Sequence, residues 1–121
     1  MAKILIVEDD KFLANAYRLK FSKAGYEIKI ASDGQDAIDS LNTFTPDIIL
    51  LDLIMPIKDG FAVLEELKKN DKWKSIPVVV ASNLGQKEDI DKSMALGATD
   101  YIVKSQIPIN DILVKINNVL K

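Results

Sequence analysis

Three short runs of consecutive apolar residues constrain the fold of this chain more than any other feature of its sequence. The runs are Lys3–Val7 (KILIV), Ile48–Leu51 (IILL) and Pro77–Ala81 (PVVVA). Each run is too short for a helix and lacks polar alternation, which is the pattern of a strand buried on both faces of a parallel sheet. Such a sheet must be covered by helices on both sides, so the chain is expected to alternate strands with helices.

The rest of the chain supplies two more strands and the helices between them. Tyr26–Ile30 alternates apolar and polar residues, as an edge strand does, and Thr99–Val103 is the fifth strand. Apolar residues at helical spacing separate the strands, and we expect Ile90 and Met94 to face inward and Asn110 to cap the last helix. The alternation predicts an α/β fold, a doubly wound five-stranded parallel sheet in the flavodoxin-like order 2-1-3-4-5 with five helices.

The composition bounds the class of protein. The 121 residues, 1–121, are expected to form a single domain with no output domain. A net charge of −2 leaves no positive surplus for direct binding of nucleic acid or of an anionic membrane surface. No apolar run reaches the roughly 20 residues of a membrane span, so no membrane insertion is expected. The chain enters its first strand without a signal-peptide pattern, which predicts a cytoplasmic protein.

The sequence contains neither histidine nor cysteine, which limits the chemistry of any site. The chain therefore lacks the commonest general base, thiol chemistry, and the imidazole and thiolate ligands of transition metals. A metal site would have to be built from oxygen atoms, which favours Mg²⁺, Mn²⁺ or Ca²⁺.

Functional side chains stand at the carboxyl ends of four predicted strands. Glu8 and Asp9 follow the first strand, Asp52 the third, Ser82 the fourth and Lys104 the fifth. Each has an ordinary explanation when taken alone: a helix start, a loop cap, a turn or a solvated lysine. The ends of parallel strands, about 4.8 Å apart, share one edge of the sheet, however, and ligands bind there at the switch point of the strand order. Their joint placement therefore favours a site.

The acidic residues at this edge point to a cation. Three converging carboxylates repel one another unless a counter-ion lies between them, and Mg²⁺ accepts a few carboxylates and a backbone carbonyl while it keeps bound waters. This arrangement leaves one aspartate free to attack phosphorus, with Lys104 to neutralise the transferred group. Phosphoryl transfer of this kind requires no histidine in the chain itself.

Four segments, in this order and spacing, resemble the response-regulator receiver family of two-component signalling, including its chemotaxis regulators. They are IVEDD, LLDLIMPIKDG, VVVAS and GATDYIVK, and the resemblance extends over essentially all 121 residues. It implies a phosphorelay signalling switch, in which Asp52 accepts a phosphoryl group from a sensor histidine kinase or a histidine phosphotransfer protein. The domain would be no metabolic enzyme, because it would catalyse only its own phosphoryl transfer and slow autodephosphorylation.

The resemblance also implies how the acidic pocket is used. Glu8 and Asp9 would form the pocket. Mg²⁺, or Mn²⁺, would bind to Asp9, Asp52 and the main-chain carbonyl of Ile54, and to Glu8 through a water molecule. Asp10 follows the matched pair and is expected to start the first helix.

The resemblance assigns the switch to the last two strands. Ser82 would be the switch hydroxyl, Tyr101 the switch aromatic residue and Lys104 the lysine that contacts the phosphoryl group. Phosphorylation would then alter the face made by the fourth helix, the fifth strand and the fifth helix. The family usually has proline directly after the lysine, whereas here Ser105 follows it and the nearest proline is Pro108. A trans Lys104–Ser105 bond and a more mobile loop are therefore expected.

Two positions that tune hydrolysis in the family are apolar here, Ile54 and Leu84. Neither side chain can orient an attacking water molecule, so slow loss of the phosphoryl group is expected.

Other functions fit the residues less well. A phosphorylation-independent receiver-like interaction module would not need the acid pair, Asp52 and Lys104. A haloacid-dehalogenase-like phosphatase would need a second acid where Ile54 stands, and a flavodoxin-like carrier would need a phosphate loop where Glu8 and Asp9 would repel phosphate. The sequence identifies neither the kinase nor the downstream protein target.

Overall fold

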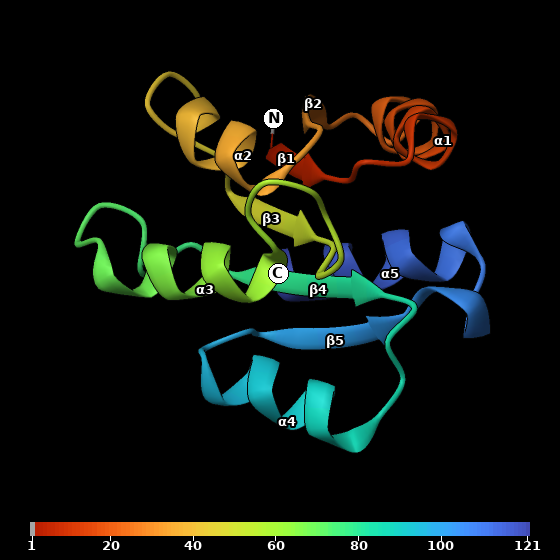
Figure 1. The fold of residues 1–121 in the computed structure, drawn as a ribbon. Coiled ribbons are helices and arrows are strands. Elements are labelled where there is room, and N and C mark those ends of the chain that lie inside the picture. The colour runs from red at the N-terminus through yellow and green to blue at the C-terminus, as the bar shows by residue number, and fades with distance from the viewer. Residues whose placement is uncertain (1) are drawn as a thin grey trace.

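The computed structural model describes residues 2–121 as a parallel sheet covered by helices (Figure 1). The strands are β1 (Lys3–Val7), β2 (Glu27–Ala31), β3 (Ile48–Leu51), β4 (Val78–Ser82) and β5 (Asp100–Val103). The helices are α1 (Lys11–Lys23), α2 (Gly34–Ser40), α3 (Gly60–Lys69), α4 (Lys87–Ala95) and α5 (Ile109–Leu120). A short 3-10 turn, Lys104–Gln106, separates β5 from α5.

The sheet has the predicted topology. Its five parallel strands lie in the order β2-β1-β3-β4-β5, with Val7 of β1 paired with Leu51 of β3 at the switch point. The fold class expected from the sequence is confirmed. The observed strand bounds differ from the expected ones by a residue at β2, β4 and β5.

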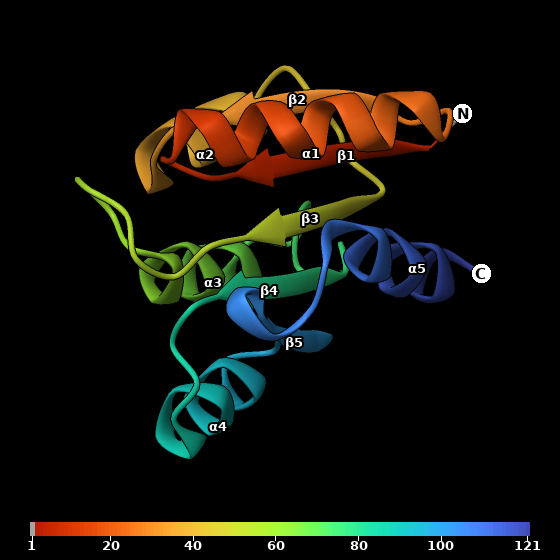
Figure 2. The ribbon, with the colours of Figure 1, turned by 90° about the vertical axis from the view of Figure 1, so that its right-hand side faces the viewer.

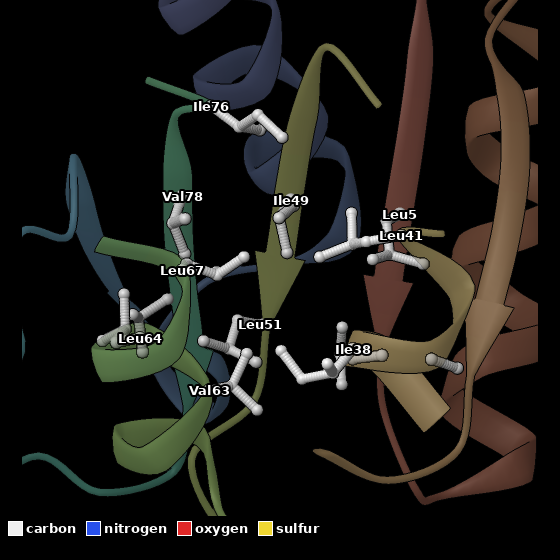
Figure 3. Packing of buried hydrophobic residues seen from close by; sticks show 14 of the residues in the cluster. Leu5, Ile38, Leu41, Ile49, Leu51, Val63, Leu64, Leu67, Ile76 and Val78 are labelled. Carbon is white, nitrogen blue, oxygen red and sulfur yellow. The ribbon is translucent and has the colours of Figure 1, made fainter. Parts of the chain in front are cut away.

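The two faces of the sheet carry separate cores because successive strand residues point to opposite sides. On one face, Leu5, Leu51 and Val78 pack against residues of α2 and α3 such as Leu64 and Leu67 (Figure 3). The other face is covered by α1 and α5, which lie in front of the sheet in Figure 2. Its buried strand residues are Ile4, Ile6, Ile48, Leu50, Val79, Ala81 and Ile102.

Two expectations about helices are wrong. Met94 is 43% exposed, and the one buried residue of α4 is Ser93, whose hydroxyl donates to the carbonyl of Asp89. The helix packs beside β5 at the edge of the sheet, where a narrow contact accepts a serine and leaves Met94 outside. At the start of α5, Pro108 occupies the cap position without a side-chain hydrogen bond, so Asn110 lies inside the helix instead of capping it.

Aspartates cap three helices and fix how the chain leaves the sheet. Asp10 accepts hydrogen bonds from the backbone N–H groups of the first turn of α1, as expected from its place after the acid pair. Asp33 caps α2 and Asp59 caps α3 in the same manner. Within residues 2–121, no helix is long and apolar enough to cross a membrane.

Candidate functional site

The predicted site residues divide between the two faces of the sheet according to strand alternation. Glu8 continues the row of Ile4 and Ile6, and Asp52 continues that of Ile48 and Leu50. Lys104 stands two residues after Ile102, on the same α1 and α5 side. Ser82 and Tyr101 instead follow the alternation of the α2 and α3 side. This alternation directs Glu8, Asp52 and Lys104 to one side of the carboxyl edge and Ser82 and Tyr101 to the other.

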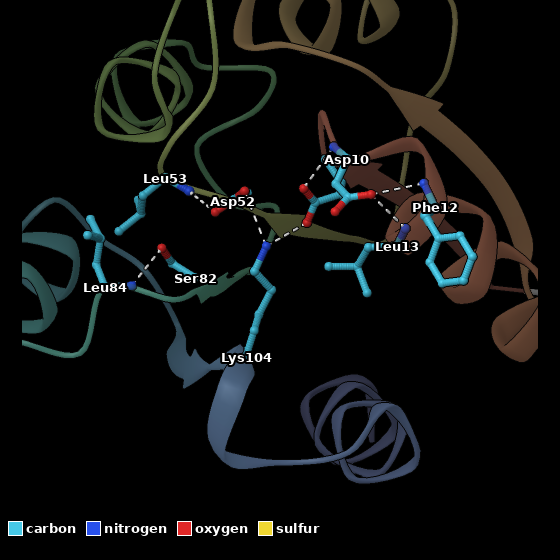
Figure 4. A network of polar contacts seen from close by, with 9 residues as sticks. Asp10, Phe12, Leu13, Asp52, Leu53, Ser82, Leu84 and Lys104 are labelled. Atoms are coloured by element: carbon cyan, nitrogen blue, oxygen red, sulfur yellow. Dashed lines mark hydrogen bonds and ion pairs between the residues drawn. The ribbon is translucent and has the colours of Figure 1, made fainter.

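Lys104 forms ion pairs with the acidic residues that directly follow β1 and β3. Its Nζ lies 2.7 Å from Oε1 of Glu8 and 3.3 Å from Oδ2 of Asp52 (Figure 4). The side chains of both acids are almost fully buried, at 3% and 8% relative exposure. A buried charge is stable only when it is paired, so the lysine is required as a counter-ion at this depth.

Burial and the ion pair between Lys104 and Glu8 have opposite effects on the pKa values of the two residues. Burial raises the pKa of Glu8, and the nearby charge of Asp52 adds to the increase, although the hydrogen bond from Lys104 opposes it. Burial alone would lower the pKa of Lys104, but the hydrogen bond to Glu8 and the charge of Asp52 outweigh it and raise that pKa. The lysine is therefore fully charged at neutral pH, whereas the Glu8 carboxylate lies in an environment that disfavours its charge.

Asp52 is held from the backbone as well as by the lysine. The N–H of Leu53 donates to its Oδ1 at 2.8 Å, so each carboxylate oxygen has one donor. Gly60, the first residue of α3, lies against the main chain at this point: a Cβ atom there would stand 2.3 Å from the carbonyl oxygen of Asp52. The position of the carboxylate is thus set by a lysine, a backbone N–H and a close approach that only glycine allows.

Three acids meet where the sequence predicts a cation site. Carboxylate oxygens of Glu8, Asp9 and Asp52 all lie within 4.8 Å of one another. Asp9 is exposed, whereas Glu8 and Asp52 are buried, so the cluster opens to solvent on one side. An all-oxygen donor set with an open side fits Mg²⁺ or Mn²⁺, which bind few carboxylates and keep several waters.

Ser82 and Tyr101 are both bound to the backbone of Leu84. The N–H of Leu84 donates to Oγ of Ser82 at 3.2 Å, and the hydroxyl of Tyr101 donates to the carbonyl of Leu84. Ser82 is fully buried and Tyr101 is half-buried against the α2 and α3 core. The sequence marks Leu84 only as an apolar position. Both of its hydrogen bonds use backbone atoms, so a pattern of side chains could not have predicted that Ser82 and Tyr101 share this partner.

The segment after Lys104 forms a defined turn. No cis peptide bond occurs in residues 2–121, so the Lys104–Ser105 bond is trans, as expected. The 3-10 turn begins at Lys104 itself, and the side chain of this lysine is 11% exposed and bound to two acids. The side chain of Lys104 thus has a defined position, while the mobility of the loop stays a prediction.

The loop between β3 and α3 protrudes beyond the sheet and contains a strained residue (Figure 2). Ile57 has a φ of 71°, the one positive value at a non-glycine residue in the described chain, and its side chain is 82% exposed. The N–H of Lys58 donates to the carbonyl of Pro56 at 2.8 Å, which closes a γ-turn around Ile57. A β-branched side chain in this conformation is unfavourable and gains no packing in return.

Replacing Ile57 with glycine is expected to raise the free energy of unfolding by about 1 kcal/mol, because glycine adopts positive φ without steric cost. Urea denaturation of the two proteins measures the difference. Ile54→Gly is the matched control, since Ile54 is an exposed isoleucine of the same loop without positive φ. Equal or lower stability of Ile57→Gly would mean that the turn is not strained.

The fold and this edge together define the class of protein: a doubly wound α/β domain with a cluster of three carboxylates and a paired lysine at its switch point. Comparison with known families then identifies it. Residues 4–117 match the response regulator receiver domain, and the chain belongs to that family, whose members are signalling domains of two-component systems.

Curated relatives and solved structures agree with this assignment. The chain is 34% identical over 106 residues to the probable transcriptional regulator ycf27 of Guillardia theta, covering 88% of this chain and 41% of that protein. It is 31% identical over 121 residues to the DNA-binding dual master transcriptional regulator RpaA of Synechocystis, covering 100% of this chain and 50% of that protein. The chain therefore spans about half the length, or less, of these relatives.

Two receiver structures show how closely the backbone matches. The receiver domain of the Francisella response regulator 1452 has a TM-score of 0.91 at 30% identity, with 99% of this chain and 97% of that chain covered. The chemotaxis response regulator CheY4 of Vibrio cholerae has a TM-score of 0.91 at 28% identity, with 99% of each chain covered.

Proposed function

We propose that this domain is a phosphorylation-dependent switch in which Asp52 accepts a phosphoryl group from a sensor histidine kinase or a histidine phosphotransfer protein. The observation that carries the proposal is the position of the Asp52 carboxylate, which is bound by Lys104 and lies within 4.8 Å of Glu8 and Asp9 oxygens. The transfer forms a bond between an Asp52 oxygen and phosphorus. The bond from phosphorus to the donor imidazole nitrogen breaks, and its electron pair stays with the imidazole.

Each residue of the site has a role in this proposal. Asp9, Asp52 and the main-chain carbonyl of Ile54 would hold Mg²⁺ or Mn²⁺, with Glu8 bound through water, and the ion would supply positive charge to the transferred group. Lys104 would move toward an oxygen of the phosphoryl group, because Asp52 loses its own charge when it is phosphorylated and the attached group carries up to two negative charges.

Ser82 and Tyr101 would convert phosphorylation into a change of surface. When the Ser82 hydroxyl turns toward the phosphoryl group it gives up its bond to Leu84, whose carbonyl also binds Tyr101. Shifting a population from 1:99 to 99:1 takes about 5.5 kcal/mol, whereas one hydrogen bond to a charged group contributes about 1.5–3 kcal/mol. Lys104 must therefore contribute as well. The surface altered would be that of α4, β5 and α5, where a downstream protein would bind.

In this proposal the domain has a narrow role. The domain acts in the cytoplasm as a receiver, with no chemistry beyond its own phosphorylation and slow autodephosphorylation, since Ile54 and Leu84 offer no group to orient water. The DNA-binding function named for the relative RpaA concerns a protein of which this chain covers 50%, and we assign no DNA contact to residues 1–121. A constitutive interaction module that is never phosphorylated is the alternative.

Intact mass after incubation with acetyl phosphate tests the proposal. We expect an added phosphoryl group that requires Mg²⁺ and is absent from Asp52→Asn, with Asp47→Asn, an exposed aspartate at the opposite end of β3, as the control that keeps the adduct. If no adduct forms, beryllofluoride binding separates a slow donor reaction from a pocket that takes no phosphoryl group. A pocket that takes neither reagent would support the constitutive module.

A further inference from the structure

The aromatic residue Tyr17 on α1 has a buried hydroxyl without a protein partner. Tyr17 is 1% exposed and stacks on Phe21 with a ring-centroid distance of 5.8 Å. Within residues 2–121, its hydroxyl oxygen is the one buried side-chain polar atom that makes no hydrogen bond. Phenylalanine would fill the same space without the cost of burying an unpaired hydroxyl, so packing alone does not account for this oxygen.

The fold places Tyr17 in the core beside the strand residues that lead into the acidic pocket. Tyr17 packs in the core of the α1 and α5 side with Ile6 and Leu50, the residues that precede Glu8 and Asp52 in their rows. Long side chains on a helix lean toward its amino end, and α1 begins next to the pocket. Burial raises the pKa of Tyr17, and the negative charges of Glu8 and Asp52 raise it further, which is consistent with a hydroxyl close to both carboxylates.

Glu8 is the acceptor that phosphorylation would leave short of donors. It is 3% exposed, and its partners are Lys104 at 2.7 Å and the N–H of Asp10 at 3.2 Å. If Lys104 turns toward the phosphoryl group, as the proposed function requires, one oxygen of Glu8 loses its donor inside the protein. The metal-bound water of the proposed function would supply one donor, but an ionised carboxylate accepts several hydrogen bonds, so a further protein donor in place of the lysine would stabilise Glu8 in the buried site.

We propose that Tyr17 is a positioning residue whose hydroxyl donates a hydrogen bond to the Glu8 carboxylate in the phosphorylated state. This inference rests on the proposed function of Asp52. In the unphosphorylated protein Lys104 binds Glu8 and the Tyr17 hydroxyl is unpaired. In the phosphorylated protein Lys104 turns to the phosphoryl group and Tyr17 takes its place at Glu8. The unpaired hydroxyl is thus a feature of one state of the switch, and it makes the loss of Lys104 from Glu8 less costly.

The test uses Tyr17→Phe, which removes only the oxygen. We expect unchanged or higher stability in urea without ligand, but about tenfold weaker binding of beryllofluoride with Mg²⁺, as suits the loss of a hydrogen bond to a charged group. Tyr26→Phe is the control, because the Tyr26 hydroxyl is bound to Asn117 on α5. Its beryllofluoride affinity should equal that of the wild type.

A spectroscopic readout separates this role from a structural one. The chain has three tyrosines, so ¹³Cζ-tyrosine labelling gives few signals, and the variants assign them. Addition of Mg²⁺ and beryllofluoride should shift the Tyr17 signal and leave that of Tyr26 unchanged. An unshifted Tyr17 signal, or equal beryllofluoride affinity of Tyr17→Phe and wild type, would overturn the inference. Wild-type protein that takes neither beryllofluoride nor a phosphoryl group would instead refute the proposed function.

Discussion

Lys104→Met is expected to reduce phosphorylation of Asp52 by acetyl phosphate at least a hundredfold and to lower the free energy of unfolding without Mg²⁺ by about 3 kcal/mol. Methionine keeps the length of the side chain but leaves the buried carboxylates of Glu8 and Asp52 without their cation. Without the lysine, two buried carboxylates of like charge have no counter-ion, and this destabilises the folded state. Urea denaturation and the rate of adduct formation measure the two effects separately.

The size of this effect depends on burial, which a matched substitution can show. Lys87→Met removes another lysine–aspartate ion pair, but the side chains of Lys87 and Asp91 are 89% and 60% exposed. Water screens such a surface pair, so its loss should hardly change the stability. Combining Lys104→Met with Asp52→Asn should recover part of the loss, because one of the uncompensated charges is removed. If the two lysine variants are equally stable, the buried pairs do not stabilise the fold.

The buried strand runs in the sequence predict the sheet, and the sheet in turn predicts where the site residues meet. The run Ile48–Leu51 has no polar face, so it must lie in the middle of a covered sheet, and strand order then follows from the rules for crossovers. In a parallel sheet the carboxyl ends of the strands share one edge, so the topology alone predicts that Glu8, Asp52 and Lys104 lie together. Their ion pairs at 2.7 and 3.3 Å are the consequence of that topology.

Features that depend on the backbone or on tertiary context could not be predicted. The shared bonding of Ser82 and Tyr101 to Leu84 involves a main-chain N–H and a carbonyl, which exist at every residue. The exposure of Met94 reflects the narrow contact of α4 at the sheet edge, which helical periodicity does not encode. Tyr17 fits an ordinary core position in sequence, and only the absence of a partner for its hydroxyl distinguishes it.

Gly60→Ala is expected to lower the free energy of unfolding by about 2–3 kcal/mol and to slow phosphorylation more than tenfold. The added Cβ would stand 2.3 Å from the carbonyl oxygen of Asp52 and 2.7 Å from Cα of Leu53. Both are backbone atoms, so no side-chain rotation relieves the clash, and either α3 or the end of β3 must move. Because Asp52 is the residue displaced, stability and chemistry should fall together.

Gly85→Ala provides the control for this prediction. A Cβ atom at Gly85 would have side-chain atoms of Val103 as its nearest neighbours, at 3.8 and 3.9 Å, which is ordinary contact. Its stability should stay within about 0.5 kcal/mol of the wild type, since surface changes away from special features have small effects. Phosphorylation of Gly60→Ala at the wild-type rate would show that the Asp52 carboxylate keeps its position when the start of α3 moves. The close packing of Gly60 would then serve the fold alone, and Lys104 with the Leu53 N–H would be sufficient to place the carboxylate.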